Sequence, residues 1–372
     1  MGQTMTSTGP AFAGVLVAFI AAAAIAQETP KPSVKVDPDG TVHTGEVTVP
    51  LSNFLSPESK TWLSSRLKSP TSTGGRDFNV ADVRQKMQDA MRPALDRWLE
   101  IYPSTIEPTV IAGVKTDVVT PKAGIDRRNG KRVLINVHGG GFLVGNGVGA
   151  LIEAVPLAGR GKIKVVTIDY RMAPEHTYPA ASEDVAAVYR ELLKTYRPTN
   201  IGIYGCSAGG TLTAEAVAWF QTHDLPRPGV IGVFCSGAIQ GFWNGGDSGA
   251  INALMNGTTP RPVSTGKPAE KPVGMPRDYF EGIDQNDPLI SPGQFPEVLA
   301  KFPPTLLVTG TRDASMSNAL VTHNRMLKAG VTAELYVQEG LGHGHFTTFP
   351  GTPETADAID VIWRFFDRHL GK

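Results

Sequence analysis

The segment at residues 204–210 (YGCSAGG) constrains the fold of this 372-residue chain more than any other stretch. It closes a short apolar run at 201–203 and opens a second one, an order that predicts a strand, a tight turn and a helix. Gly205 and Gly209 flank Ser207 at a distance of two residues, because a turn this sharp leaves no room for a Cβ at either place. Such a turn exposes the serine hydroxyl beside the free N–H groups of the following helix, where negative charge on a substrate oxygen is stabilised.

A second glycine-rich segment argues against the alternative, an incidental serine in a glycine-rich turn. The apolar run at 133–137 (VLINV) leads directly into residues 138–142 (HGGGF). Consecutive glycines let a backbone approach a ligand and turn its N–H groups inward, as an oxyanion hole requires. We expect His138 to hold this loop through hydrogen bonds and to take no part in proton transfer.

These two segments and three further ones resemble the alpha/beta-hydrolase fold and, within it, the hormone-sensitive-lipase-like esterases. The further segments are DYRMAPE at 169–175, DPLISP at 287–292 and the run around His343. The resemblance covers roughly residues 105–370 and implies an α/β fold: a mainly parallel eight-stranded sheet flanked by helices, with a cap formed largely by N-terminal helices. Cys206 departs from the family, which usually carries Asp or Glu before the serine.

From Ile106 onward, short apolar runs alternate with amphipathic stretches. This alternation predicts a mainly parallel sheet covered on both faces, with ligands at the carboxyl ends of its strands. Residues 240–280 break the rhythm and predict an insertion that is either a surface loop or a source of pocket residues, among them Phe242, Trp243 and Tyr279. The expected strands are 110–114, 118–121, 133–137, 163–168, 201–205, 230–235, 305–309 and 333–338, and the expected helices between the later ones are 148–158, 183–196, 208–221, 315–329 and 354–369.

Two amphipathic helices are expected before the sheet. The first starts at an N-cap, Ser56, followed by Pro57, and the second covers residues 80–99. In the family that the chain resembles, such helices form part of a cap over the active site. The large side chains on them are therefore either core packing or pocket wall; they are Trp62, Met87, Met91 and Trp98.

The N-terminal segment at 11–26 is almost entirely apolar and ends in an A-x-A-like site before Gln27. It predicts a signal peptide and an exported protein, periplasmic or secreted, with no stable membrane span after the signal is removed. An uncleaved anchor is the competing interpretation, because the preceding stretch contains no Lys or Arg. The predicted division is a signal peptide at 1–26, a leader with cap helices at 27–104 and a catalytic domain at 105–372.

Charge and cysteine content bear on partners. With 35 basic and 35 acidic residues and no long run of either sign, the chain does not favour nucleic acid as a partner. Two cysteines give no disulfide framework, and we expect Cys206 and Cys235 to be buried thiols, although neighbouring strands could bring them close. The sequence leaves the oligomeric state open, a homo-oligomer included.

A serine nucleophile needs a base and a carboxylate, and both must come from later strand ends. Asp313 follows the strand expected at 305–309, and the resemblance places the family's acid in this G-x-x-D setting; a helix-capping carboxylate is the alternative. His343 lies in the segment that resembles the family's histidine segment, so Ser207, Asp313 and His343 follow the alpha/beta-hydrolase order. His345 is the competing base, but the family pattern aligns with His343.

The expected chemistry is ester hydrolysis through an acyl-enzyme. Ser207 attacks the ester carbonyl, His343 is the general base, and Asp313 holds the imidazole. The N–H groups expected to bind the oxyanion belong to Gly140, Gly141 and Ala208. No metal or organic cofactor is required. The expected substrate is a small-molecule ester with a small to medium acyl group; a lactone or an acetyl ester is the alternative on the same machinery.

Two other classes of protein match parts of the pattern. A dinucleotide-binding module would use the first glycine turn and Asp169, but it needs Gly or Ala at the position of Val144 and leaves the serine, aspartate and histidine without a role. A metal hydrolase built on His343, His345 and Asp313 lacks a further group of ligands with suitable spacing. A non-catalytic binding protein on the same fold conflicts with the intact set of catalytic residue types.

Overall fold

In the computed structural model, the residues described are 48–68, 79–240, 245–255 and 278–371, with short pieces at 35–36, 38 and 42–43. The predicted signal peptide at 1–26 therefore lies outside them. The chain divides into two units, Met1–Val49 and Pro50–Lys372. In the first unit, two short strands, β1 (Lys35–Val36) and β2 (Val42–His43), pair antiparallel. All the other elements belong to the second unit.

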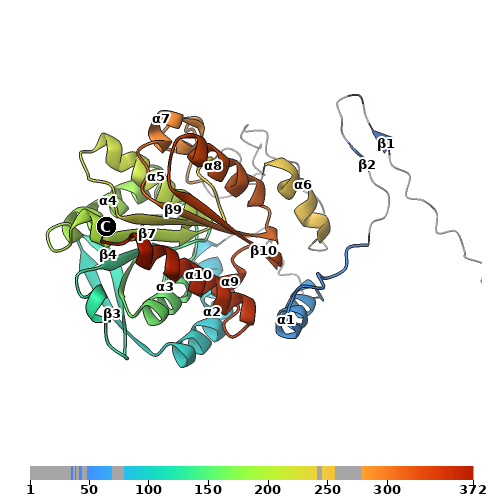
Figure 1. Cartoon of the computed structure of the whole chain (residues 1–372), viewed down its shortest axis with the longest axis horizontal. Coiled ribbons are helices and arrows are strands. Elements are labelled where there is room, and N and C mark those ends of the chain that lie inside the picture. The colour runs from blue at the N-terminus through green and yellow to red at the C-terminus, as the bar shows by residue number, and fades with distance from the viewer. Residues whose placement is uncertain are drawn as a thin grey trace, which may run out of the picture. The chain divides into compact units, whose positions relative to one another are not determined.

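An eight-stranded sheet organises the second unit, in the order β10-β9-β8-β7-β5-β6-β4-β3 (Figure 1). The pairs β3–β4 and β4–β6 are antiparallel and all the others are parallel, so the predicted sheet is confirmed. The strands are β3 (Ser104–Ile111), β4 (Val114–Pro121), β5 (Val133–Val137), β6 (Lys164–Ile168), β7 (Ile201–Cys206), β8 (Val230–Phe234), β9 (Thr305–Arg312) and β10 (Ala333–Gly342).

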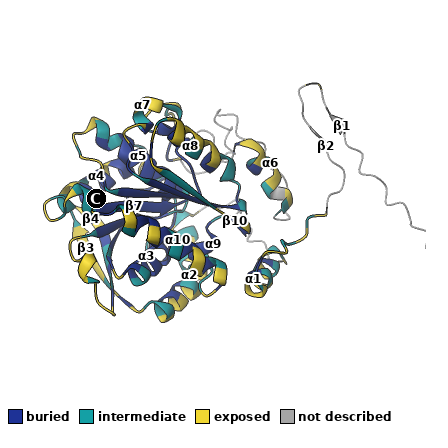
Figure 2. Cartoon of the chain, viewed as in Figure 1, coloured by how far each residue is buried: buried dark blue, intermediate teal, exposed yellow. Residues whose placement is uncertain are grey.

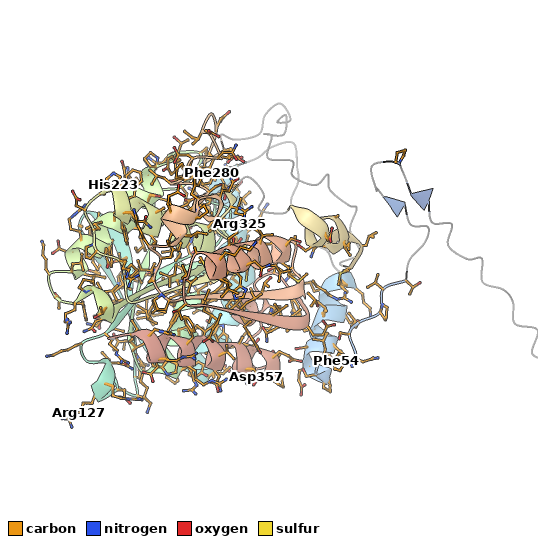
Figure 3. The ribbon with its side chains drawn as sticks, turned by 45° about the horizontal axis from the view of Figure 1, so that its top comes forward. Phe54, Arg127, His223, Phe280, Arg325 and Asp357 are labelled. Carbon is orange, nitrogen blue, oxygen red and sulfur yellow. The ribbon has the colours of Figure 1, made fainter. Side chains whose placement is uncertain are left out.

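Helices cover both faces of the sheet, and buried residues are concentrated between the layers (Figure 2). In β5, Ile135 contributes to the core under α4, α5 and α8, whereas its neighbour Leu134 contributes to the core under α3 and α10, because successive strand residues point to opposite faces. In Figure 3, His223 at the end of α5 and Asp357 of α10 mark these two sides.

The α-helices are α1 (Pro57–Lys68), α2 (Val80–Ile101), α3 (Val148–Gly161), α4 (Ala180–Leu192), α5 (Ala208–Thr222), α6 (Gly246–Met255), α7 (Pro296–Leu299), α8 (Met316–Lys328), α9 (His345–Thr348) and α10 (Pro353–His369). Short 3-10 turns are η1 (Arg127–Asn129), η2 (Pro198–Asn200) and η4 (Pro292–Gln294). Among the described helices, none has both the length and the apolar character that crossing a bilayer demands.

The N-terminal helices begin where the sequence predicts. Ser56 caps α1, since its hydroxyl accepts the amide of Ser59 at 3.1 Å, and both serine hydroxyls also donate to the Glu354 carboxylate of α10. Three of the four large side chains on these helices, Trp62, Met91 and Trp98, pack in hydrophobic clusters. Trp98 is 2% exposed and donates its indole N–H to the Thr347 carbonyl at 2.7 Å, and Trp62 packs in a small cluster beside α1.

One local prediction is wrong, and one helix was not predicted. The strand expected at 110–114 is the turn of a hairpin, in which Ala112 (φ 51°) and Gly113 (φ 84°) separate β3 from β4. The apolar residues at 110–114 predict a single strand. Val110 is apolar but 63% exposed on the edge strand β3, so apolar character does not indicate burial here. The segment at 240–280 contains a helix, α6, although it shows no helical period.

Contacts with α8 and the loop before it explain why α6 forms. The Ser248 hydroxyl donates to the Ala314 carbonyl at 3.0 Å and accepts the amide of Ser317 at 2.7 Å, and the Asn252 side chain donates to the Arg312 carbonyl. Phe242 and Trp243, named as pocket candidates, lie outside the described residues.

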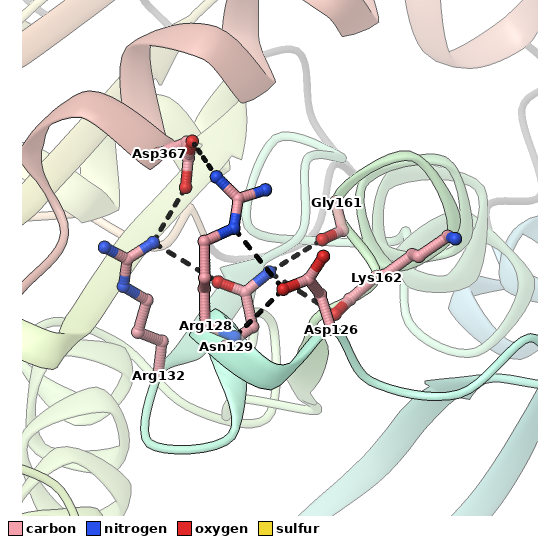
Figure 4. Close-up of polar contacts among 7 residues, drawn as sticks. All are labelled: Asp126, Arg128, Asn129, Arg132, Gly161, Lys162 and Asp367. Atoms are coloured by element: carbon pink, nitrogen blue, oxygen red, sulfur yellow. Dashed lines mark hydrogen bonds and ion pairs between the residues drawn. The ribbon is translucent and has the colours of Figure 1, made fainter.

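A polar cluster joins the elements at the amino ends of β5 and β6 (Figure 4). The Arg132 guanidinium donates to the Asp367 carboxylate of α10 at 2.7 Å, and the Asn129 amide donates to the Gly161 carbonyl at 2.8 Å. The Asp126 carboxylate caps η1 by accepting the amide of Arg128 at 2.9 Å. These contacts occupy one edge of the sheet and leave the loops at the opposite, carboxyl edge to carry the chemistry.

Candidate active site

Ser207 occupies a strained turn between β7 and α5. Its φ of 61° and ψ of −125° are unusual for a non-glycine residue and cost about 1–3 kcal/mol. The Ser207 amide donates to the Phe234 carbonyl at 2.8 Å, which holds the turn against β8. A Cβ at Gly205 or at Gly209 would collide with the Val137 carbonyl oxygen, and this crowding explains the G-x-S-x-G spacing.

The glycine loop after β5 presents unused amides beside this turn. Gly140 (φ 117°) and Gly141 (φ 65°) both have positive φ, and a Cβ at Gly140 would collide with the Val144 carbonyl. Ala208 is the first residue of α5, where helix amides have no intrahelical partner. Among the residues that the structure describes, the amides of Gly140, Gly141 and Ala208 donate no hydrogen bond, so they are available to a ligand.

His138 anchors the start of this loop. Its Nδ1 lies 2.7 Å from the Gly139 carbonyl, its ring stacks on Tyr170 at 4.3 Å, and the Tyr170 hydroxyl donates to the His138 carbonyl at 2.8 Å. Burial lowers the pKa of His138 to about 4, so the imidazole is neutral and donates from Nδ1. The expected hydrogen-bonding role of His138 is confirmed.

Packing beneath the loop uses Tyr279, for which the sequence allows either a pocket residue or part of a surface loop. Its ring stacks on Phe142 at 4.7 Å, it is 1% exposed, and its hydroxyl accepts the amide of Ala181 at 2.7 Å. Tyr279 is therefore a core residue that supports the glycine loop from behind.

An arginine of α2 reaches the same loop. The Arg84 guanidinium donates to the Leu143 and Ala173 carbonyls, each at 2.8 Å, and forms a two-pronged ion pair with Glu175. Sequence reasoning missed Arg84, because these partners lie 59 to 91 residues away along the chain. The DYRMAPE segment thus docks a helix against the glycine loop.

The structure brings Asp313 and His343 into direct contact. They follow β9 and β10, and the His343 Nδ1 lies 2.9 Å from the Asp313 Oδ1. Asp313 is 1% exposed and accepts hydrogen bonds from the Ser315 amide at 2.9 Å, the Ser315 hydroxyl at 2.8 Å and the Thr309 hydroxyl at 3.1 Å. The carboxylate is therefore fixed on every side and orients the imidazole.

The pairing of Asp313 with His343 shifts the pKa of each group in the direction opposite to the effect of burial. Burial lowers the pKa of His343, but the Asp313 carboxylate raises it by more, so the net shift is upward. Burial raises the pKa of Asp313, but His343 and the Ser315 hydrogen bonds together outweigh it, so the net shift is downward. Arg66 of α1 opposes protonation of His343 and Glu153 of α3 favours it. An ionised aspartate beside a histidine of this kind suits a general base.

His345 lies in a different environment. It is 3% exposed, its Nδ1 contacts the Gly342 carbonyl at 3.2 Å, and burial lowers its pKa to about 4. Its ring nitrogens make no hydrogen bond to Asp313 within the described part of the chain. Of the two candidate bases, the structure places His343 at the carboxylate.

Cys206 and Cys235 are free, buried thiols, as the sequence predicted. The two side chains are close enough to interact. The Cys235 sulfur and ligand atoms of Asp313 and His343 lie within 4.8 Å of one another. Burial raises the pKa of both thiols, which keeps them protonated in the absence of a metal ion.

Sequence reasoning also missed Glu153, a buried carboxylate of α3 that lies between the glycine loop and the serine turn. Its amide partners are Gly139 and Cys206, and burial raises its pKa to about 7. An acidic residue inside the apolar run at 148–158 was the available signal, since a buried carboxylate requires partners.

Fold and site together define the class of this protein. Residues 134–347 match the model of a protein family that is described as having the alpha/beta hydrolase fold. The chain belongs to this family and, within it, to the hormone-sensitive-lipase-like esterases. It is a serine ester hydrolase, a carboxylesterase.

Individual relatives support this placement. The chain is 32% identical to an esterase of Acinetobacter venetianus over 290 residues, which cover 74% of this chain and 88% of that protein. It is 26% identical to the esterase LipI of Mycobacterium tuberculosis over 309 residues, 76% of this chain and 87% of the relative. The crystal structure of esterase E25 is similar with a TM-score of 0.71 at 31% identity, covering 88% of this chain and 98% of E25. That of an esterase from the bacterial hormone-sensitive lipase family gives a TM-score of 0.70 at 25% identity, covering 85% and 99%.

Proposed function

We propose that this protein hydrolyses small-molecule carboxylic esters with small to medium acyl groups, using a triad of Ser207, His343 and Asp313. The observation that supports the triad most directly is the 2.9 Å contact between His343 and Asp313, at the same sheet edge as the strained serine turn. The oxyanion hole consists of the amides of Gly140, Gly141 and Ala208.

In the proposed reaction, the Ser207 Oγ attacks the ester carbonyl while the His343 Nε2 accepts the hydroxyl proton. Asp313 keeps the proton on the His343 Nδ1 and stabilises the imidazolium. The loop amides bind the negative oxygen of the tetrahedral intermediate. The alcohol leaves with the proton from His343, and water, deprotonated by the same imidazole, then releases the acid.

The N-terminal helices form part of a cap over this site, within a segment at 27–104 that precedes the catalytic domain at 105–372. One ring contact and one electrostatic effect support this assignment. The Trp62 ring of α1 contacts Phe349, six residues after His343, and the charge of Arg66 acts on the pKa of His343.

A panel of nitrophenyl esters graded by acyl length, with a lactone and an acetylated compound as further arms, tests the activity. Ser207→Ala and His343→Ala should each lower turnover on the order of 10⁴-fold, because the triad acts as a unit. The matched control is His345→Gln, which keeps an N–H donor near the Gly342 carbonyl and should stay within about tenfold of the wild type. Full turnover in His343→Ala with none in His345→Gln would show that the base is misassigned.

We also propose that residues 1–26 are a signal peptide and that the mature protein is exported. The support is the apolar run at 11–26 and its small-residue end before Gln27. Intact-mass measurement of protein recovered from the envelope of the source cell should give a chain that starts at Gln27. A mass that still includes residues 1–26 contradicts the proposal.

A further inference from the structure

We propose that Glu153 is a positioning residue that holds the oxyanion loop and the nucleophile turn in register, and that it does so as a carboxylate. This inference rests on the triad and the oxyanion hole proposed above. It assigns a role to a side chain of α3 that touches neither the substrate nor the reacting atoms.

Glu153 joins the two catalytic segments directly. Its Oε1 accepts the Gly139 amide at 2.9 Å, immediately before the oxyanion glycines, and its Oε2 accepts the Cys206 amide at 3.2 Å, immediately before Ser207. These segments leave two neighbouring parallel strands, β5 and β7. A single carboxylate therefore sets the separation between the oxyanion donors and the attacking hydroxyl.

Every contact of this carboxylate comes from a donor. Besides the two amides, the Asn136 Nδ2 donates to the Glu153 Oε2 at 3.0 Å, and the Thr167 hydroxyl donates to the Asn136 Oδ1 at 3.0 Å, which fixes the direction of that amide. A glutamine would direct an N–H toward one of these donors and lose a contact, and a protonated carboxyl would carry a buried O–H to which these three contacts offer no acceptor. The arrangement is therefore complete only while Glu153 is ionised.

The residue before the serine, Cys206, carries no charge of its own, and Glu153 brings a carboxylate to the Cys206 amide from helix α3. The side chain is 7% exposed, so the ionised form needs all three donors as compensation.

Glu153 takes up its proton near neutral pH, because burial raises its pKa to about 7. The titratable groups that act on it or respond to it are His343, Tyr170, Tyr204, Cys206 and Cys235. Burial raises the pKa values of these tyrosines and thiols, so they stay neutral near pH 7. His343 is the partner that changes charge there, and an ionised Glu153 raises its pKa.

Two protonations should therefore lower kcat as pH falls: protonation of His343 stops the reaction, and protonation of Glu153 reduces kcat by a further finite factor. Over the pH range in which both groups protonate, the logarithm of kcat should fall with a slope above one, as expected for a coupled pair. In Glu153→Gln, kcat at the optimum should fall roughly 10- to 100-fold with little change in KM, because a displaced oxyanion donor weakens only the transition state. Its acid limb should have a slope of one and lie at lower pH, since the charge that raises the His343 pKa is gone.

Glu215→Gln is the matched control. Glu215 is a second buried glutamate, on α5, and its carboxylate oxygens have no hydrogen-bond partner among the described residues. The same substitution there removes a buried carboxyl without touching the two catalytic segments. Its kcat and its acid-limb slope should match those of the wild type.

A wild-type kcat and a slope above one in folded Glu153→Gln, checked by circular dichroism, overturn the inference. Should that variant fail to fold, the wild-type profile decides, because an acid limb whose slope nowhere exceeds one shows that Glu153 does not titrate with activity. Ser207→Ala separates this outcome from failure of the triad. If Ser207→Ala is inactive while Glu153→Gln is normal, the positioning role alone is wrong; if Ser207→Ala keeps its activity, the triad is wrong.

Discussion

Buried titratable side chains outside the triad make the stability of this protein depend on pH. Burial lowers the pKa values of His138 and His345 to about 4, below the ordinary histidine value of 6.5. Between these values the unfolded chain binds protons that the folded protein does not, so the free energy of unfolding falls as pH drops from about 6.5 toward 4. Glu215 has the opposite effect, because burial raises the pKa of its carboxyl well above 4.5.

The slope that Glu215 contributes can be measured with Glu215→Gln. Above pH 4.5 the unfolded chain releases this proton and the folded protein keeps it, so the wild type loses about 1.4 kcal/mol of stability per pH unit until the folded pKa is reached. Denaturant unfolding from pH 4 to 8 should therefore show the variant gaining on the wild type as pH rises. His138 and His345 are common to both proteins and cancel in the difference. Parallel curves would mean that Glu215 is ionised in the folded state.

At the scale of elements, α2 supports the glycine loop after β5 as well as packing against the core. Arg84 provides the polar link, and the buried side chains of Leu95 and Trp98 pack the rest of the helix against the core beside α3. The helix starts where Asn79 caps it, its Oδ1 accepting the amide of Ala81 at 2.9 Å. Helix α2, which precedes the sheet in the sequence, thereby helps to fix the conformation of the glycine loop.

Substitution of Arg84 tests this link. Arg84→Lys keeps the positive charge but has no planar fork to reach the Leu143 and Ala173 carbonyls and Glu175 together, so kcat should fall on the order of tenfold through a displaced loop. Arg97→Lys is the control on the same helix, because Arg97 is 55% exposed and pairs with Glu100 one turn along. The rate of ester hydrolysis at saturating substrate gives kcat for both variants. If Arg84→Lys and Arg97→Lys have the same kcat, the conformation of the glycine loop does not depend on Arg84.

At the scale of the whole molecule, the sequence predicts the parts of this fold whose determinants are local. The strands β5 and β7 are apolar runs that end in glycine-rich turns, and β9 is an apolar run that ends directly before Asp313. Each of these ends carries a candidate catalytic residue. The contact between Asp313 and His343 then follows from topology, because parallel neighbouring strands bring their carboxyl ends together.

The remainder depends on contacts between distant segments, which periodicity does not encode. Glu153 stands in an apolar run as a single acidic residue, and its importance lies in amides that reach it from β5 and β7. Helix α6 is held by Ser248 through contacts made 66 to 69 residues away. Tyr279 looked like a pocket residue because its sequence surroundings are irregular, yet it stacks on Phe142 in the core.

The polar cluster around Asp367 has an evolutionary consequence. Arg132 and Asn129 fasten the C-terminal helix and the end of α3 to the amino edge of the sheet, while the proposed chemistry lies in loops at the other edge. Loops on a rigid scaffold accept substitutions, insertions and deletions more readily than the elements that they connect. Descendants of such a chain can therefore acquire new ester preferences by altering the loops at the carboxyl edge, and the residues that close the amino edge need not change with them.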